Sequence, residues 1–188
     1  EANVGVKLSK KQNIWLDAGI MPSHIGFESA ISADCWTLTR SLLAENSPYY
    51  ETGIKLGYTS KNEKLNISAL YLNGWQKINK PDFTQKPSFG TQINFKLSKK
   101  LLLSYSTFFG TDKPDSIKAI RQFHNFYLQY EPTSKFGIIA GFDIGIDKFN
   151  HTSYGAWYSP ILIIKQSINN KIGIAVRGEY YNDPKQII

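Results

Sequence analysis

The chain has 188 residues, a formal net charge of +7 and a mean hydropathy of −0.31. It has no run of about 18 apolar residues, which excludes a transmembrane helix. A β-barrel is still allowed, because its strands alternate apolar and polar residues. Tyr and Phe contribute 11 residues each, which favours strands over helices. Cys35 is the only cysteine, so a disulfide framework and a cysteine-based metal site are excluded.

Short polar turns divide the chain into pairs of alternating segments. The turns are LSKKQN (8–13), YTSKNEK (58–64), LSKKL (97–101), TSKF (133–136) and INNK (168–171). Each lies between two segments with a period of two residues, as in an antiparallel hairpin. The predicted hairpins join 3–8 to 13–21, 50–59 to 63–74, 89–97 to 101–109, 122–131 to 135–147, and 152–167 to 171–181.

The connections between these hairpins are mostly longer than the turns inside them. They are 22–49, 75–88, 110–121 and the brief 148–151. Short turns at one end and long loops at the other are typical of outer-membrane barrels. Most of the segments also reach the length of about 9–11 residues that spans a membrane at a tilt. We therefore predict an all-β fold, an antiparallel up-and-down transmembrane β-barrel with roughly ten strands in one domain over 1–188.

Charged residues within the strands are predicted to face the barrel interior. On the lipid-facing side each would cost about 2–4 kcal/mol near the membrane midplane. Such residues could form ion-pair ladders between strands, or line a water-filled pore of weak ion selectivity. The pore-lining candidates are Lys55, Lys96, Glu131, Asp143, Asp147, Lys165, Arg177 and Glu179.

Two strands contain residues that fit a regular barrel poorly. Pro160 lies within 152–167, and because proline cannot donate to the ladder we expect a bulge or a strand end there. Leu102 and Phe108 fall on the inward face of 101–109, where they would pack against an object inside the barrel.

The loop 22–49 contains a predicted short helix. Asp34 is the expected N-cap, Leu38, Leu42 and Leu43 form one apolar stripe, and Ser47-Pro48 ends the helix. A loop of this length could fold into the lumen or lie over the rim, and both arrangements are left open. The constriction candidates are Arg40, Glu45 and Asn46.

Little in the sequence indicates catalysis or a cofactor. His24, His124 and His151 are far apart and show no metal-ligand spacing. Ser104 and Ser106 could approach His124 in a barrel, but no local motif accompanies them. Every short turn carries lysine, so we interpret much of the positive charge as solvated turn residues and expect no nucleic-acid partner. We expect no enzyme activity, no metal and no cofactor.

The segment DAGIMPSHIGFESAISADCWTLTRSLLAENSPYYETGIKLGY (17–58) resembles the outer-membrane β-barrel porins common in Bacteroidetes. The strand ending in AGIMPSHIGFES, the following TRSLLAENSPYYETG and a later LYLNGWQ (70–76) carry this resemblance. It implies an outer-membrane location in a Gram-negative bacterium and a passive channel. The chain ends in NDPKQII, where a long loop should start, so we expect it to be part of a larger barrel.

Three functions are compatible with the sequence. The first is a porin, a transport protein through which small hydrophilic solutes or ions diffuse passively across the outer membrane. The second is a structural surface barrel, or one that binds a ligand or glycan, with a plugged lumen, and the third is a soluble β-sandwich binding module. For the porin the expected partners are outer-membrane lipid and small hydrophilic solutes, with a homo-oligomer left open.

Overall fold

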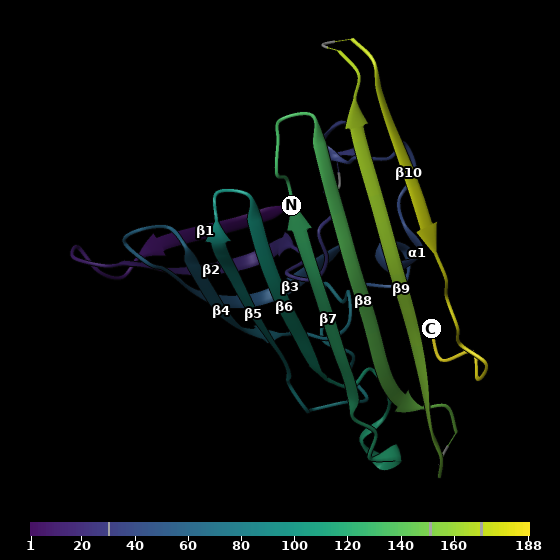
Figure 1. Cartoon of the computed structure of the whole chain (residues 1–188). Coiled ribbons are helices and arrows are strands. Elements are labelled where there is room, and N and C mark those ends of the chain that lie inside the picture. The colour runs from purple at the N-terminus through teal and green to yellow at the C-terminus, as the bar shows by residue number, and fades with distance from the viewer. Residues whose placement is uncertain (30, 151, 170) are drawn as a thin grey trace.

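In a computed structural model of the chain, which describes all residues except 30, 151 and 170, ten strands form one antiparallel sheet (Figure 1). Each strand pairs with its neighbours in the sequence, so the predicted all-β, up-and-down fold is confirmed. The strands are β1 (Ala2–Lys7), β2 (Asn13–Pro22), β3 (Tyr50–Thr59), β4 (Leu65–Leu72), β5 (Ser88–Ser98), β6 (Leu101–Gly110), β7 (Arg121–Tyr130), β8 (Phe136–Lys148), β9 (Tyr154–Ser167) and β10 (Gly173–Glu179).

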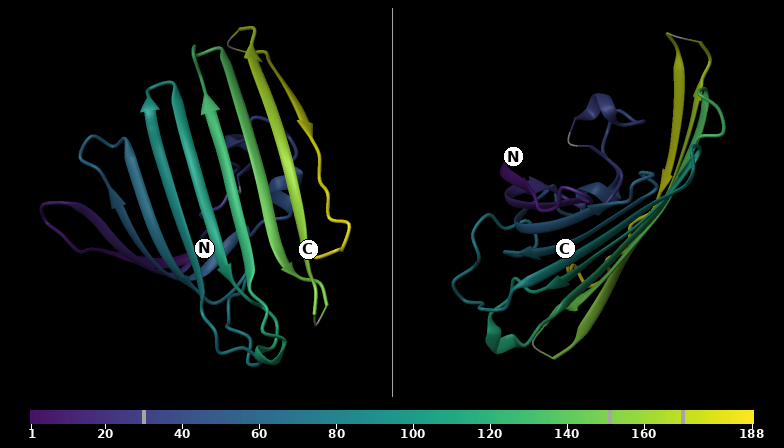
Figure 2. Two further views of the ribbon diagram at one scale, coloured as in Figure 1. Left: turned by 60° about the horizontal axis from the view of Figure 1, so that its bottom comes forward. Right: turned by 90° about the vertical axis from the view of Figure 1, so that its left-hand side faces the viewer.

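The sheet is single, open and strongly curved. β1 and β10 form its two edges, and all described strands belong to it, which argues against a sandwich of two packed sheets. The five short turns lie along one edge of the strand array, and the longer connections lie along the opposite edge (Figure 2, left). Helix in the described residues is limited to α1 (Leu42–Glu45) and the 3-10 turns η1 (Ser32–Asp34) and η2 (Asp115–Ile117).

The two faces of the sheet differ sharply in polarity. One row of cross-strand neighbours is apolar and partly exposed, and it consists of Ile67, Ile93, Tyr105, Phe126 and Phe142. The adjacent row points to the other face and is polar, and it consists of Ser68, Gln92, Ser106, Asn125 and Asp143. Because successive residues of a strand point to opposite faces, this alternation gives one apolar and one polar surface.

The segment 22–49 crosses the polar face on the concave side of the sheet (Figure 2, right). Its helix is shorter than expected, since Ser41 rather than Asp34 is the N-cap of α1 and its side chain accepts a hydrogen bond from Ala44 N. Asp34 instead ends the 3-10 turn η1. Phe108 is fully buried in a cluster that also contains Ile25 from this segment, as expected for an inward apolar residue.

Pro160 causes no interruption, contrary to the expectation of a bulge or strand end. β9 continues through it in regular register, with Pro160 paired to Phe142 of β8. On the β10 side, Tyr180 N donates to the Pro160 carbonyl at 3.1 Å. The Tyr180 carbonyl cannot receive a bond from proline, and the Ser159 hydroxyl donates to it at 2.8 Å instead. A neighbouring side chain therefore replaces the missing ladder bond.

Candidate functional site

His24 joins the segment 22–49 to three strands of the polar face. Its Nε2 donates to the Thr107 carbonyl of β6 at 2.8 Å, and its Nδ1 bonds to the Glu51 carboxylate of β3. A carbonyl and a carboxylate as partners favour a ring that is protonated at both nitrogens. Gln92 of β5 and Ser106 of β6 donate to the His24 carbonyl, the second at 2.8 Å. His24 and Glu51 are almost completely buried.

The pKa of His24 is shaped by opposing effects. Burial lowers it, but the Glu51 carboxylate and the bond to Thr107 outweigh burial and raise the pKa above its usual value of 6.5. The imidazolium form is therefore the one that this site stabilises. We call His24, Glu51 and the bonds to the His24 carbonyl the anchor of the segment.

Inward-facing glycines make room for the segment against the sheet. A Cβ at Gly90 of β5 would lie 2.7 Å from the His24 ring, so a larger residue would displace the anchor. A Cβ at Gly137 of β8 would lie 2.4 Å from the Trp36 ring. These positions are glycine because only a residue without a side chain lets the rings lie directly on the strands.

Apolar side chains fix the short helix on β8 and β9. Leu43 is buried in a cluster with Ile139, Ile161 and Ile163, and Phe27 and Trp36 pack around that cluster. Ser41, at the start of the helix, bonds to the Glu28 carboxylate through both N and Oγ, at 2.9 Å each. The helix is thus held by packing on one side and by a carboxylate at its N-terminus.

The far end of the segment meets β10 through two pore-lining candidates. Arg177 donates to Thr37 Oγ1 at 2.9 Å and to the Thr39 carbonyl at 2.5 Å. Glu179 pairs with Arg177 at 3.0 Å and accepts from Leu42 N at 2.8 Å. Both charged residues bind the segment and are not free in solvent.

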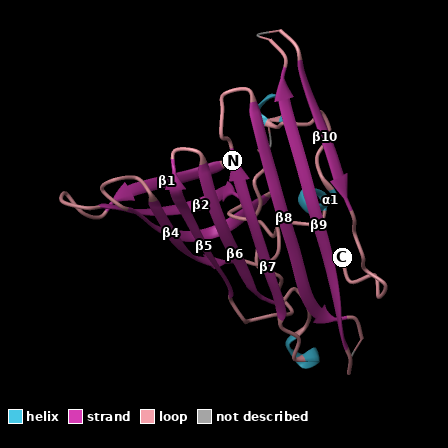
Figure 3. Ribbon diagram, viewed as in Figure 1, coloured by secondary structure: helices cyan, strands magenta, loops and turns pink. Residues whose placement is uncertain are grey.

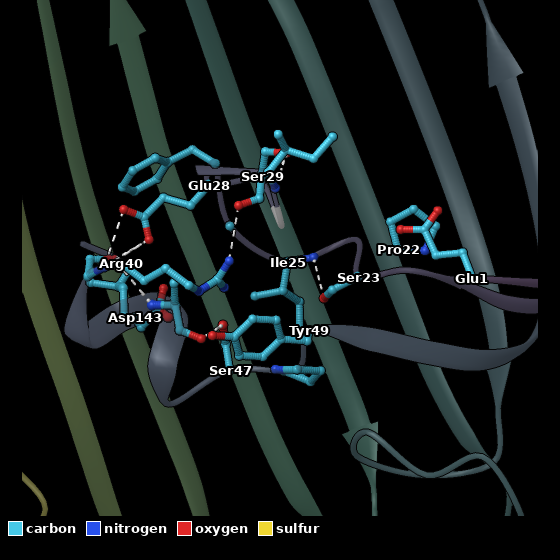
Figure 4. A pocket seen from close by; sticks show the side chains of 17 residues that line it. Glu1, Pro22, Ser23, Ile25, Glu28, Ser29, Arg40, Ser47, Tyr49 and Asp143 are labelled. Atoms are coloured by element: carbon cyan, nitrogen blue, oxygen red, sulfur yellow. Dashed lines mark hydrogen bonds between the residues drawn. The ribbon is translucent and has the colours of Figure 1, made fainter. Parts of the chain in front are cut away.

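A cavity of about 210 Å³ lies between the segment and the sheet, and of the constriction candidates Arg40 lines it (Figure 4). The Arg40 guanidinium lies 3.8 Å from the centre of the Tyr49 ring and pairs with Glu45 at 3.2 Å. Asn46 does not line this cavity, since its amide bonds to the Leu42 carbonyl at 2.8 Å and caps α1. Arg40 is therefore the only one of the three that is among the described residues lining the cavity.

Other pore-lining candidates fall into different surroundings. Lys55 pairs with Asp17 at 3.3 Å beside a second polar cavity of about 290 Å³, and Asp143 is buried and bonded to Asn125 at 2.5 Å. Lys165 lies 4.8 Å from the centre of the Trp36 ring. Lys96 and Glu131 lie at the short-turn end and are exposed, so they flank the mouth and not the middle of this face.

A cluster of charged residues lies at the end of the sheet that carries the long loops. Asp147 pairs with Arg121 at 3.1 Å and with Lys113 at 3.3 Å, and Arg121 also lies 3.7 Å from Asp112. Burial raises the pKa of Asp112, while Arg121 opposes that rise. The Arg121 guanidinium stacks on Trp75, so this cluster ties two long connections to the strands.

The residues weighed for catalysis do not come together. His124 lies on the outer, apolar face, where its Nδ1 bonds to the Tyr105 hydroxyl at 2.7 Å, while Ser104 and Ser106 point to the inner face. His151 lies outside the described residues. In the part of the chain that the structure describes, no cluster of potential metal ligands is found, and no helix is long and apolar enough to cross a membrane.

Sequence reasoning missed the residues that carry the anchor. Glu51 is the only acidic residue near the start of β3, and it lies four residues before Lys55, so both point to the inward face. This shared face could have identified Glu51 from the sequence. His24 offered no such signal, because its partners lie 27 and 83 residues away. The glycines of GIIAGFDIG (137–145), at alternate inward positions, indicated that something lies against β8.

One protein-family model matches the whole chain, residues 1–188, and its description reads "Putative beta-barrel porin-2, OmpL-like". Comparison with curated proteins found no match, and comparison with solved structures found none. The family match agrees with the single up-and-down sheet and with its apolar outer face.

Proposed function

This chain belongs to the OmpL-like family of β-barrel porins, and we propose that it forms part of an outer-membrane channel for passive diffusion of small hydrophilic solutes or ions. The sheet supplies the wall, with its apolar face toward lipid and its polar face toward water. We propose no enzymatic activity and no cofactor. A further part of the proposal is that residues 22–49 lie inside the lumen of the closed barrel.

One observation carries this proposal: the buried attachment of 22–49 to the polar face. A segment lying over the rim would touch only strand ends. Here Gly26 N donates to Asn125 Oδ1 at 3.2 Å in the middle of β7, and the His24 carbonyl accepts from β5 and β6. Charges placed on such an inner segment act on passing ions at short range, because a narrow pore leaves little water to screen them.

Conductance across a planar bilayer tests the proposal. The folded full-length protein should give discrete open-channel steps, and replacing residues 34–46 by a short Gly-Ser linker should raise the single-channel conductance. The linker removes Arg40, Glu45 and the helix, and it leaves the anchor at His24 in place.

The outcomes separate the alternatives. Steps of unchanged size in the linker variant would mean that 34–46 does not narrow the pore. A folded, heat-modifiable barrel without any steps, even with the linker, would contradict the channel and favour a plugged, ligand-binding barrel. A chain that folds in buffer without detergent would contradict both.

A further inference from the structure

The excess positive charge of the chain is concentrated at the short-turn end of the sheet. The described parts of the five turns, 8–12, 60–64, 99–100, 131–135 and 168–172 without residue 170, contain eight lysines and two glutamates, an excess of six charges. The whole chain carries +7. In the sequence these lysines are scattered, but the fold brings all five turns to one edge of the strand array (Figure 2, left). We call these five turns the lysine rim.

The lysines of the rim are free to bind an external partner. All eight are exposed, and among the described residues none of them forms an ion pair. The opposite end is different. The long connections 73–87 and 111–120 contain five lysines and three aspartates, and Lys113 is already paired with Asp147. The charge asymmetry between the two ends is therefore a property of the fold.

Apolar side chains lie directly beside the lysine rim on the outer face. Tyr58 and Phe95 point outward a few residues before their turns, and Leu97, Tyr130 and Ile172 are likewise exposed. Exposed apolar side chains directly next to a row of cations match the boundary between the hydrocarbon and the headgroups of a lipid bilayer. Lysine suits this boundary because its aliphatic stem can lie along these apolar side chains while the ammonium reaches outward.

We propose that the lysine rim binds the anionic phosphodiester headgroups of the lipid leaflet that it meets. This rests on the proposed membrane barrel. Basic residues at an anionic membrane surface each contribute about 1 kcal/mol of attraction. Short turns of such barrels face the periplasm, so the leaflet concerned is the inner one. The rim thereby fixes the depth of the barrel.

Energy transfer from tryptophan to pyrene-labelled lipids tests this proposal. The folded protein is inserted into phosphatidylcholine vesicles that contain traces of either pyrene-phosphatidylglycerol or pyrene-phosphatidylcholine, and the ratio of the two transfer signals is measured. We expect the ratio to exceed one and to fall at about 1 M salt, where the screening length is about 3 Å. Replacing Lys10, Lys11, Lys99 and Lys100 by Gln should lower the ratio at least about threefold, given the attraction of each lysine.

A matched variant controls for net charge. Replacing Lys77, Lys86, Lys118 and Lys185 by Gln removes the same four charges from exposed sites at the other end, and it should leave the ratio unchanged. The proposal would be overturned if both variants lowered the ratio of the transfer signals equally, or if that ratio were one in the wild type. Heat-modifiable migration of every sample reports the barrel separately, so a folded barrel without lipid preference refutes the rim alone. Failure of the wild type to insert refutes the proposed function.

Discussion

Two parts of the segment 22–49 are held in very different ways: its start at residues 22–28 and its middle at residues 31–39. At the start, His24 is bonded to β3, β5 and β6, and Ile25 is buried among side chains of β4, β6, β7 and β9. In the middle, Ile31 is 62% exposed and Leu38 is 97% exposed. The middle touches β8 through Trp36 and β10 through the bonds from Arg177, and the helix that follows it packs on β8 and β9. The start is thus bonded to several strands, whereas none of the residues 31–39 is buried.

This difference predicts separate behaviour for the start and the middle of the segment. A part bonded to several strands moves only when those bonds break, so we expect the start to keep its position. A part with exposed apolar residues and few contacts has low local stability and is the part that can change position. We expect gating motions, where they occur, to start between residues 31 and 39 and to stop at the anchor.

Breaking the anchor should have the largest effect. Glu51→Ala leaves the His24 imidazolium buried without its counter-charge, and losing one partner of a buried pair costs about 3–5 kcal/mol. We expect a loss of that order in the free energy of unfolding, measured by urea titration of tryptophan fluorescence in lipid vesicles. Single-channel conductance should also rise as the start of the segment detaches.

Glu45→Ala is the matched control for the anchor. Glu45 lies in the same segment, but its side chain is 50% exposed and pairs with Arg40 at the surface of the cavity. Exposed pairs contribute about 0–1 kcal/mol. Equal destabilisation by the two substitutions would contradict the special role of the buried pair.

A leucine pair compares the exposed middle of the segment with the packed helix that follows it. Leu43→Ala removes a side chain that is 3% exposed and leaves a cavity against β8 and β9, at a cost of about 3 kcal/mol. Leu38→Ala makes the same chemical change on a side chain without burial and should stay within about 0.5 kcal/mol. Urea midpoints of the two variants measure the difference. Similar midpoints would mean that the helix does not rest on the strands.

The alternation of residues was sufficient to predict the sheet, but not the way its inner face is covered. Pairs such as Tyr58 with Ile67 follow from parity and turn position alone, because hairpin register is local. The anchor depends on contacts between residues far apart in sequence, which no periodicity encodes. The helix start was misplaced because Asp34 and Ser41 are both good N-caps, and packing of Leu43 decides between them.

Pro160 shows why a correct local rule can fail in context. The rule that proline lacks a ladder donor holds here, but the Ser159 hydroxyl satisfies the carbonyl that proline leaves unpaired. Such compensation depends on the side chain of a neighbour and on where β10 ends. Sequence alone indicated the unpaired carbonyl and could not indicate its replacement.

A change of pH should give the smallest effect and should act on the anchored start of the segment alone. The pKa of His24 is raised above 6.5, so the stability from the imidazolium is fully present below that pH and is lost as pH rises through the raised pKa. The charged groups that act on the ring are Glu51, which favours the imidazolium, and Lys55, which opposes it. The bonds from Gln92 and Ser106 to the His24 carbonyl do not titrate, so the segment loosens without detaching.

Open-channel current noise recorded between about pH 5 and pH 9 measures this loosening, since the range brackets the ordinary pKa of histidine. In the wild type the noise should rise toward alkaline pH. In His24→Gln the side chain still carries an amide donor but cannot titrate, so the noise should be flat over the same range. A parallel rise in both proteins would place the titrating group elsewhere, and a rise toward acid pH would contradict the sign of the linkage. If the current noise of the wild type does not change with pH while that of Glu51→Ala is high, the anchor holds the segment in either protonation state of His24.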